Sequence, residues 1–258
     1  MAWEETESLS FAARHESERA EEAAAVLDEL EGFRDRLNEL FDVTPWDVAV
    51  VIHPAPLQLY LAQPWLPLAR FAAAPASRRY FSGWFSSREI HVLSPAVLRE
   101  RASNVPGSRE AMRLAPLHEY AHMVVGANNK RLPPPFNPGS FRRYLRWAWL
   151  CEGAATWLSG QAQFLGPAIA RYMHEGGRPA FPPRPRDALL LGGSVFGLLE
   201  RERGRQECIE LATQLHPDGA VAALERAFGG HRFEIEALWR RYLTELATRA
   251  PTGRASSR

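Results

Sequence analysis

Apolar residues recur along the first part of the chain with two different periods. Between residues 15 and 41 they are spaced by three, four and seven positions, which predicts a long amphipathic helix. The stripe consists of Ala20, Ala24, Leu27, Leu30, Leu37 and Leu40. A continuous apolar run then predicts a strand at about 47–53. The segments RYFSGWF (79–85) and REIHVL (88–93) predict two further strands joined by a Ser-Ser turn. The proline-containing stretch between the first strand and this pair favours short helical turns.

The rest of the chain has helical periodicity interrupted by two loops rich in proline. Two apolar helices are predicted, at 108–127 and at 141–166, and the segments GANNKRLPPPFNPGS and GGRPAFPPRPRD predict loops. Further helices are predicted at about 187–203, 205–215, 217–228 and 232–248. The pattern indicates an α+β fold. We expect disordered ends at 1–14 and 251–258, and one domain over 15–250 with an α/β lobe (15–127) and a helical lobe (128–250).

Composition narrows the class of protein. The chain has 258 residues, of which 46% are hydrophobic and 24% charged, as in a globular domain with a sizeable core. The formal net charge is +1, so neither nucleic acid nor an anionic membrane is an expected partner. Two cysteines make no disulfide framework. The acidic N-terminus lacks a secretory signal, and no apolar run is long enough to span a bilayer, so a cytoplasmic location is expected.

The stretch LHEYAHMVV, residues 117–125, carries the most specific chemistry. On a helix, His118 and His122 project from the same face and can offer two imidazole nitrogens to one metal ion. Glu119 lies one position further round, where its carboxylate can reach a water held by that metal. A catalytic zinc ion uses three protein ligands, so one more ligand must come from elsewhere in the chain.

Glu152, in WLCEGAATWL, is the best candidate for the third ligand. It interrupts an apolar stripe on the predicted helix, formed by Phe141, Leu145, Ala148 and Ala155. A buried carboxylate is costly unless it is paired or bound to a metal. Two alternatives remain at this point: the histidines are core residues with carbonyl partners, or Glu152 forms a salt bridge with Arg143 or Arg146.

Together, HEYAH and WLCEGAATW resemble the motifs of the gluzincin metallopeptidases, the group that includes thermolysin and the zinc aminopeptidases. The closer likeness is to peptidase-MA-like domains, over about residues 15–247. The resemblance implies a zincin-like fold, with a small mixed-sheet lobe carrying an edge strand, an active-site helix and a helical C-terminal region. It also implies one zinc ion held by His118, His122 and Glu152, Glu119 as general base, and a peptide or protein as substrate.

The sequence also departs from that pattern. Pro116 predicts that the motif helix starts at Ala115 or kinks there. The tyrosine expected near DALLLGGSVFGLLERERG, as an oxyanion donor, is replaced by leucines and glycines. Tyr172 or His174 could substitute, although both also fit an ordinary loop. The Gly-x-Met-Glu-Asn element of aminopeptidases is absent from the sequence.

The sequence also suggests where a substrate would pair with the sheet, and it leaves two other functions open. We expect REIHVL to be the edge strand that pairs with an extended substrate, and its His91 either reaches the cleft or lies on the strand surface. Two alternatives to a peptidase remain open. One is a zinc-binding scaffold that is catalytically weak or inactive, and the other is an interaction module without metal. Neither cleavage specificity nor oligomeric state follows from the sequence.

Overall fold

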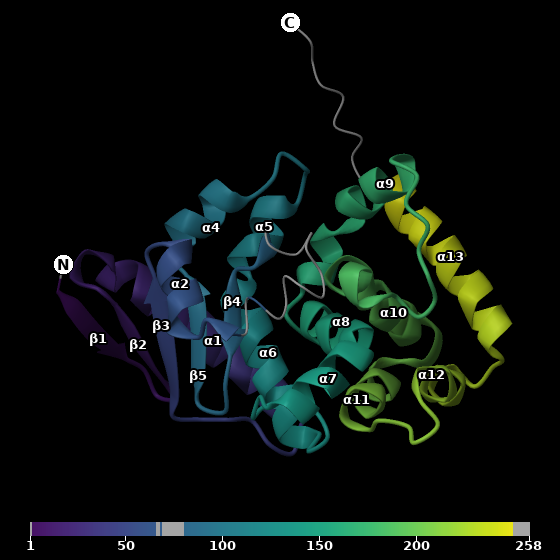
Figure 1. Cartoon of the computed structure of the whole chain (residues 1–258), viewed down its shortest axis with the longest axis horizontal. Helices are drawn as coiled ribbons and strands as arrows, with labels where there is room; N and C mark the ends of the chain where they lie inside the picture. Colours follow the sequence, from purple (N-terminus) through teal and green to yellow (C-terminus); the bar gives the residue numbers. More distant parts are fainter. Residues whose placement is uncertain (1, 66–67, 69–79, 250–258) are drawn as a thin grey trace, which may run out of the picture.

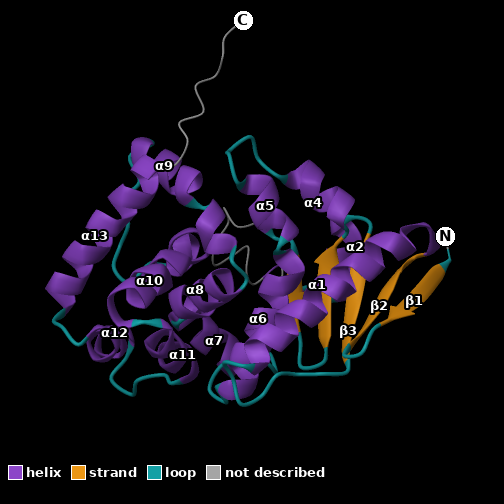
Figure 2. Ribbon diagram, turned by 180° about the vertical axis from the view of Figure 1, so that it is seen from behind, coloured by secondary structure: helices purple, strands orange, loops and turns teal. Residues whose placement is uncertain are grey.

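A five-stranded mixed sheet lies at one end of the molecule in the computed structural model, which describes residues 2–65, 68 and 80–249 (Figures 1 and 2). The strands are β1 (Trp3–Glu7), β2 (Phe11–Glu16), β3 (Val48–His53), β4 (Gly83–Phe85) and β5 (Glu89–Leu93). Their spatial order is β1-β2-β3-β5-β4. The two central pairings, β2 with β3 and β3 with β5, are parallel, whereas both outer pairings are antiparallel. The predicted α+β class is therefore confirmed.

The first residues of the chain belong to this sheet, so the prediction of a disordered segment at 1–14 is wrong. Strand β1 pairs along its length with β2, from Trp3 opposite Glu16 to Glu7 opposite Ala12. On β2, Phe11 and Ala13 are buried in the core. The sequence of β1, WEETE, is acidic and mostly exposed, so backbone pairing rather than apolar burial holds it in place. The predicted disordered tail, 251–258, lies outside the described residues.

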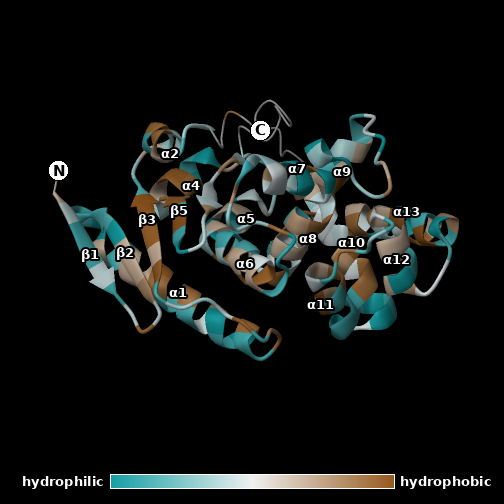
Figure 3. Ribbon diagram, turned by 60° about the horizontal axis from the view of Figure 1, so that its bottom comes forward, coloured by the Kyte–Doolittle hydropathy of each residue, from teal (hydrophilic) through white to brown (hydrophobic). Residues whose placement is uncertain are grey.

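Two helices cover one face of the sheet. Helix α1 (Ala20–Asn38) packs against β2, and α6 (Ala115–Asn128) packs against β4 and β5. Alternation on β3 buries Val48, Val50 and Ile52 beneath these helices. Figure 3 shows the hydrophobic character of β3 and β5 beside the more polar outer surface of α1. Packing against the central strands thereby fixes where α6 lies.

The remaining helices connect or extend this layer. Between β3 and α6 lie α2 (Pro56–Ala62), α4 (Pro95–Arg101) and α5 (Ser108–Arg113). After α6 come α7 (Pro138–Arg146), α8 (Ala148–Leu158), α9 (Gly166–His174), α10 (Ala188–Arg203), α11 (Arg205–Thr213), α12 (Ala220–Phe228) and α13 (Arg232–Arg249). The four C-terminal helices confirm the sequence prediction. Helices α4 and α9 fall where no helix was predicted. No helix among the described residues has both the length and the apolar character needed to cross a membrane.

Two predicted helices are each divided in two, and the edge strand differs from expectation. The helix predicted at 108–127 breaks at Leu114. The one predicted at 141–166 breaks at Trp147 and ends at Leu158, after which a short 3-10 helix spans Gln161–Phe164. Strand β5, which comprises the last five residues of REIHVL, lies between β3 and β4 and is therefore an inner strand. The edge beside α6 is β4 instead, because β4 pairs only with β5 within the described sheet. Sheet order depends on long-range pairing, which strand propensity does not encode.

Candidate metal centre

Helix α6 places the two motif histidines on one buried face. It begins at Ala115, directly after the break that ends α5, so Pro116 lies in its first turn. A proline there removes no helical hydrogen bond, since the first N–H groups have no partner within the helix. The amide of His118 still donates to the carbonyl of Leu114, at 3.0 Å. The prediction that the motif helix starts at Ala115 is confirmed.

Helix α8 brings Glu152 to the same point. Its carboxylate is 2% exposed, and its Oε2 lies 3.5 Å from Nε2 of His118. Its Oε1 lies 3.8 Å from Nε2 of His122, and the two Nε2 atoms are 3.1 Å apart. The predicted convergence of the three residues is therefore confirmed. The guanidinium of Arg143, one of the alternative partners, instead donates to the carbonyl of Arg131.

These distances fit a single divalent cation. Ligand atoms that lie 2.0–2.1 Å from a tetrahedral zinc ion are separated from one another by about 3.4 Å. The two Nε2 atoms are 3.1 Å apart, and the nearest carboxylate oxygens of Glu152 lie at 3.5 Å (Oε2 to His118) and 3.8 Å (Oε1 to His122), all close to that value. All three side chains are buried, and one ligand atom from each lies within 4.8 Å of the others. The group formed by His118, His122 and Glu152 can therefore hold a metal ion.

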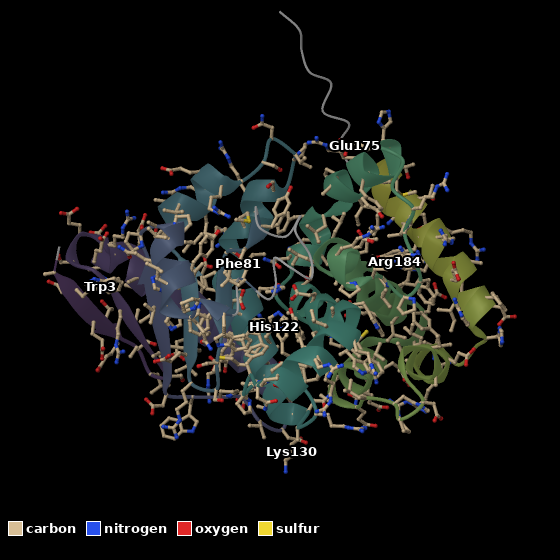
Figure 4. All side chains as sticks on the ribbon, in the orientation of Figure 1. Trp3, Phe81, His122, Lys130, Glu175 and Arg184 are labelled. Carbon is tan, nitrogen blue, oxygen red and sulfur yellow. The ribbon has the colours of Figure 1, made fainter. Side chains whose placement is uncertain are left out.

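Burial explains why a cation suits this place. Two neutral imidazoles whose Nε2 atoms face one another either share one N–H···N hydrogen bond or direct both lone pairs at a cation between them. The nearby carboxylate of Glu152 adds negative charge in a position that water barely reaches. A buried carboxylate that is bound to a cation avoids the free-energy cost of an uncompensated charge. Figure 4 shows His122 in the middle of the molecule, between the sheet and the C-terminal helices.

A cavity of about 440 Å³ opens beside His118, the one of the three ligands that lines it. Its wall includes His118, Glu119 and Gly83 of strand β4, and much of the remaining lining is apolar, including Met112 and Phe164. A Cβ atom at Gly83 would lie 2.9 Å from Cγ of Glu119. Glycine therefore lets the edge strand approach the Glu119 carboxylate closely. The cavity is large enough for side chains of a peptide-sized ligand.

The structure separates the other candidate residues. Tyr172 lies on α9 and lines this cavity, and burial followed by the negative charge of Asp187 raises its pKa. His174, at the exposed end of the same helix, does not line it. His91 is buried and forms a hydrogen bond with His53 at 2.9 Å. It does not line the cavity and does not lie on the surface, so both predictions for this residue are wrong.

Sequence analysis missed two features around Glu152. The hydroxyl of Tyr144, on α7, donates a hydrogen bond to Oε1 of Glu152. A Cβ atom at Gly153 would lie 2.7 Å from the backbone carbonyl of Gly192, so this glycine pair allows α8 and α10 to pack closely. Gly192 belongs to the segment where a tyrosine was expected, and helix packing accounts for the glycine there. The thiol of Cys151 is buried outside the ligand group, and burial raises its pKa.

No protein-family model matches the chain, and no curated protein gives a significant match. The function of the site therefore has to follow from its own geometry and chemistry.

Proposed function

We propose that this protein is a zinc-dependent peptide-bond hydrolase with a zincin-like fold, similar to the gluzincin metallopeptidases. One observation carries the proposal. Three buried ligands converge at metal-binding separations, and Glu119, directly after the first ligand, lies on the wall of the adjoining cavity. A purely structural metal site has no use for such a carboxylate. The donor set of two imidazoles and one carboxylate is that of catalytic zinc sites, which keep a fourth position for water.

The residues of the chain divide the chemistry between them. His118, His122 and Glu152 would hold a zinc ion, which would lower the pKa of a bound water toward neutrality and polarise a substrate carbonyl. Glu119 accepts the proton of the attacking water and then passes it to the leaving nitrogen. Tyr172 is our candidate for the donor that stabilises the negative oxygen of the tetrahedral intermediate. Its place on the wall of the cavity that His118 and Glu119 also line supports this role, since a phenol is protonated and can donate at neutral pH.

The edge strand and the cavity support a peptide as the substrate. Strand β4 is an edge of the described sheet, although its three residues are buried, and an extended peptide can add to a sheet edge through backbone hydrogen bonds. Gly83 on this strand lies close to Glu119, since a Cβ atom there would be 2.9 Å from Cγ of Glu119. A peptide paired with β4 would therefore run past the general base, and its side chains would enter the mainly apolar cavity.

The proposal is tested by turnover of a mixed peptide library. We expect the zinc-loaded protein to cleave peptides, a strong chelator to stop cleavage, and added zinc to restore it. Products identified by mass spectrometry should include internal cleavages, since the library presents extended segments of several lengths. A zinc-loaded protein that cleaves nothing would instead favour the scaffold alternative, and a protein that binds no zinc would favour the interaction module.

A further inference from the structure

We propose that Tyr144 is a positioning residue that holds the Glu152 carboxylate in place for the metal ion. This inference rests on the metal centre of the proposed function but not on peptide hydrolysis. The phenol hydroxyl donates to Oε1 of Glu152, while Oε2 faces His118. The tyrosine thus holds the carboxylate oxygen that lies nearer His122 and leaves the other oxygen directed at His118.

The fold reaches this contact only because the helix is broken. Tyr144 and Glu152 are eight residues apart, and eight residues of straight α-helix advance by about 12 Å. A tyrosine side chain cannot span that distance along one helix. The chain instead ends α7 at Arg146, turns at Trp147 and begins α8 at Ala148. The turn brings the tyrosine of one helix against the glutamate of the next.

Packing also fixes the tyrosine itself. Its side chain is buried, with 5% exposed, and its ring stacks on Phe141 with centroids 6.2 Å apart. Phe136 meets the ring edge-on at 6.0 Å, and the ligand His122 meets it from another side at 6.5 Å. A capping box at Asn137 anchors the start of α7. The hydroxyl therefore has a defined position and little freedom to leave it.

The chemistry of the donor suits a metal ligand. A neutral phenol orients the carboxylate without cancelling its negative charge, so that charge remains available to the cation. An arginine at this distance would compete with the metal for the same charge. The neighbouring Arg143 is directed elsewhere, since it donates to the carbonyl of Arg131 at 2.7 Å. Partners of this kind commonly change metal affinity by about 10–100-fold.

The test compares two tyrosine-to-phenylalanine variants by competition for zinc with a chromophoric chelator. Tyr144→Phe should lower zinc affinity by about 10–100-fold. Tyr120→Phe is the matched control. Tyr120 lies on the motif helix itself, and its hydroxyl donates to the carbonyl of Pro45 at a distance of 2.7 Å. This variant also loses one phenolic oxygen from the protein core, and its zinc affinity should equal that of the parent. Equal losses in both variants would overturn the inference, because general loosening would then explain them.

A second measurement asks whether Tyr144 acts through Glu152. In a Glu152→Ala background, adding Tyr144→Phe should change the remaining zinc affinity by less than about twofold, because the acceptor is already gone. An additional tenfold loss there would contradict the inference. Failure of this inference is distinguishable from failure of the proposed function. If the parent binds zinc and Tyr144→Phe binds it equally well, only the positioning role is wrong; if the parent binds no zinc, the metal centre itself is wrong.

Discussion

The molecule buries two pairs of histidines that look alike in isolation. On helix α6, the Nε2 atoms of His118 and His122 are 3.1 Å apart. On the sheet, Nε2 of His53 lies 2.9 Å from Nδ1 of His91, across the pairing of β3 with β5. All four rings are buried. Proximity and burial therefore do not by themselves define a metal site.

The two pairs differ in whether a third metal-binding side chain lies nearby and in whether a cavity reaches them. Glu152, buried on a separate helix, approaches both members of the first pair. Beside the second pair, Glu89 approaches only His91, at 3.5 Å, and nearly half of its side chain is exposed. Among the described residues, the first pair alone belongs to a group of three ligand atoms close enough for one ion. It also adjoins the cavity.

The sheet pair has a structural explanation. His91 stacks on Trp84 with ring centroids 3.8 Å apart and bonds to His53. Burial, followed by the electrostatic effect of His91, lowers the pKa of His53 to about 4. Two neutral imidazoles can then share one hydrogen bond, since one ring donates and the other accepts. The sheet pair is therefore explained by packing and one hydrogen bond, whereas the helix pair has a third potential metal ligand beside it, Glu152.

The largest expected effect is on catalytic rate, and it distinguishes Glu119, beside the helix pair, from Glu89, beside the sheet pair. Glu119→Gln should lower kcat/KM for a cleaved peptide by about 10²–10⁴-fold, because glutamine cannot accept the proton of the attacking water. Its zinc content should match that of the parent. Glu89→Gln makes the same change beside the sheet pair and should leave the rate unaltered. A Glu119→Gln variant that cleaves as fast as the parent would show that the general base is another group.

The second prediction removes one histidine from each pair. His122→Gln should weaken zinc binding by more than about 100-fold, beyond the usual effect of an outer hydrogen-bond partner, because a ligand itself is lost. His53→Gln should retain the parent affinity, since His53 is outside the ligand group. Isothermal titration or chelator competition measures both. Loss of zinc affinity in His53→Gln would remove the distinction between the two pairs.

The smallest expected effect is a pH dependence that belongs to the sheet pair. The pKa of His53 is lowered in the folded protein from about 6.5 to about 4. Between these values the unfolded chain binds more protons, so the free energy of unfolding falls as the pH falls. The contribution of His53 is fully present above about pH 6.5, and about 2 kcal/mol of it is lost between pH 7 and pH 5.

Urea unfolding at pH 7 and pH 5, with chelator present, measures this effect. The parent should lose about 2 kcal/mol more than His53→Gln over that interval, because the variant lacks the buried imidazole. The pKa of His91 is also lowered, chiefly by burial, so its titration acts in the same direction. Equal pH dependence in the parent and the variant would show that His53 does not titrate differently on folding.

The sequence was sufficient for features that depend on local periodicity. The spacing of His118 and His122 predicts one helix face, and an acidic residue on an apolar stretch predicts a buried role for Glu152. The ligand group confirms both. The stripe used for Glu152 was nevertheless partly wrong. Phe141 and Leu145 belong to α7, beyond the break at Trp147, so only Ala148 and Ala155 share its helix.

Features that depend on how elements pair or pack with one another could not be read in the same way. Strand β1 has almost no apolar signal, and its place follows from backbone bonds to β2. The inner position of β5 follows from the pairing of β4 beyond it. The contact between Tyr144 and Glu152 depends on the helix break at Trp147, which the sequence does not signal because apolar residues lie on both sides of it. Each of these is a tertiary outcome that overrides local propensity.

The central claim is that His118, His122 and Glu152 hold one zinc ion with a position left for water. X-ray absorption spectroscopy at the zinc edge, on protein loaded with zinc and dialysed, tests it most directly. We predict one zinc ion per chain, with two imidazoles among nitrogen and oxygen neighbours at about 2.0–2.1 Å. Clearly substoichiometric zinc, or a sulfur neighbour at about 2.3 Å that would implicate a cysteine such as Cys151, would contradict the account.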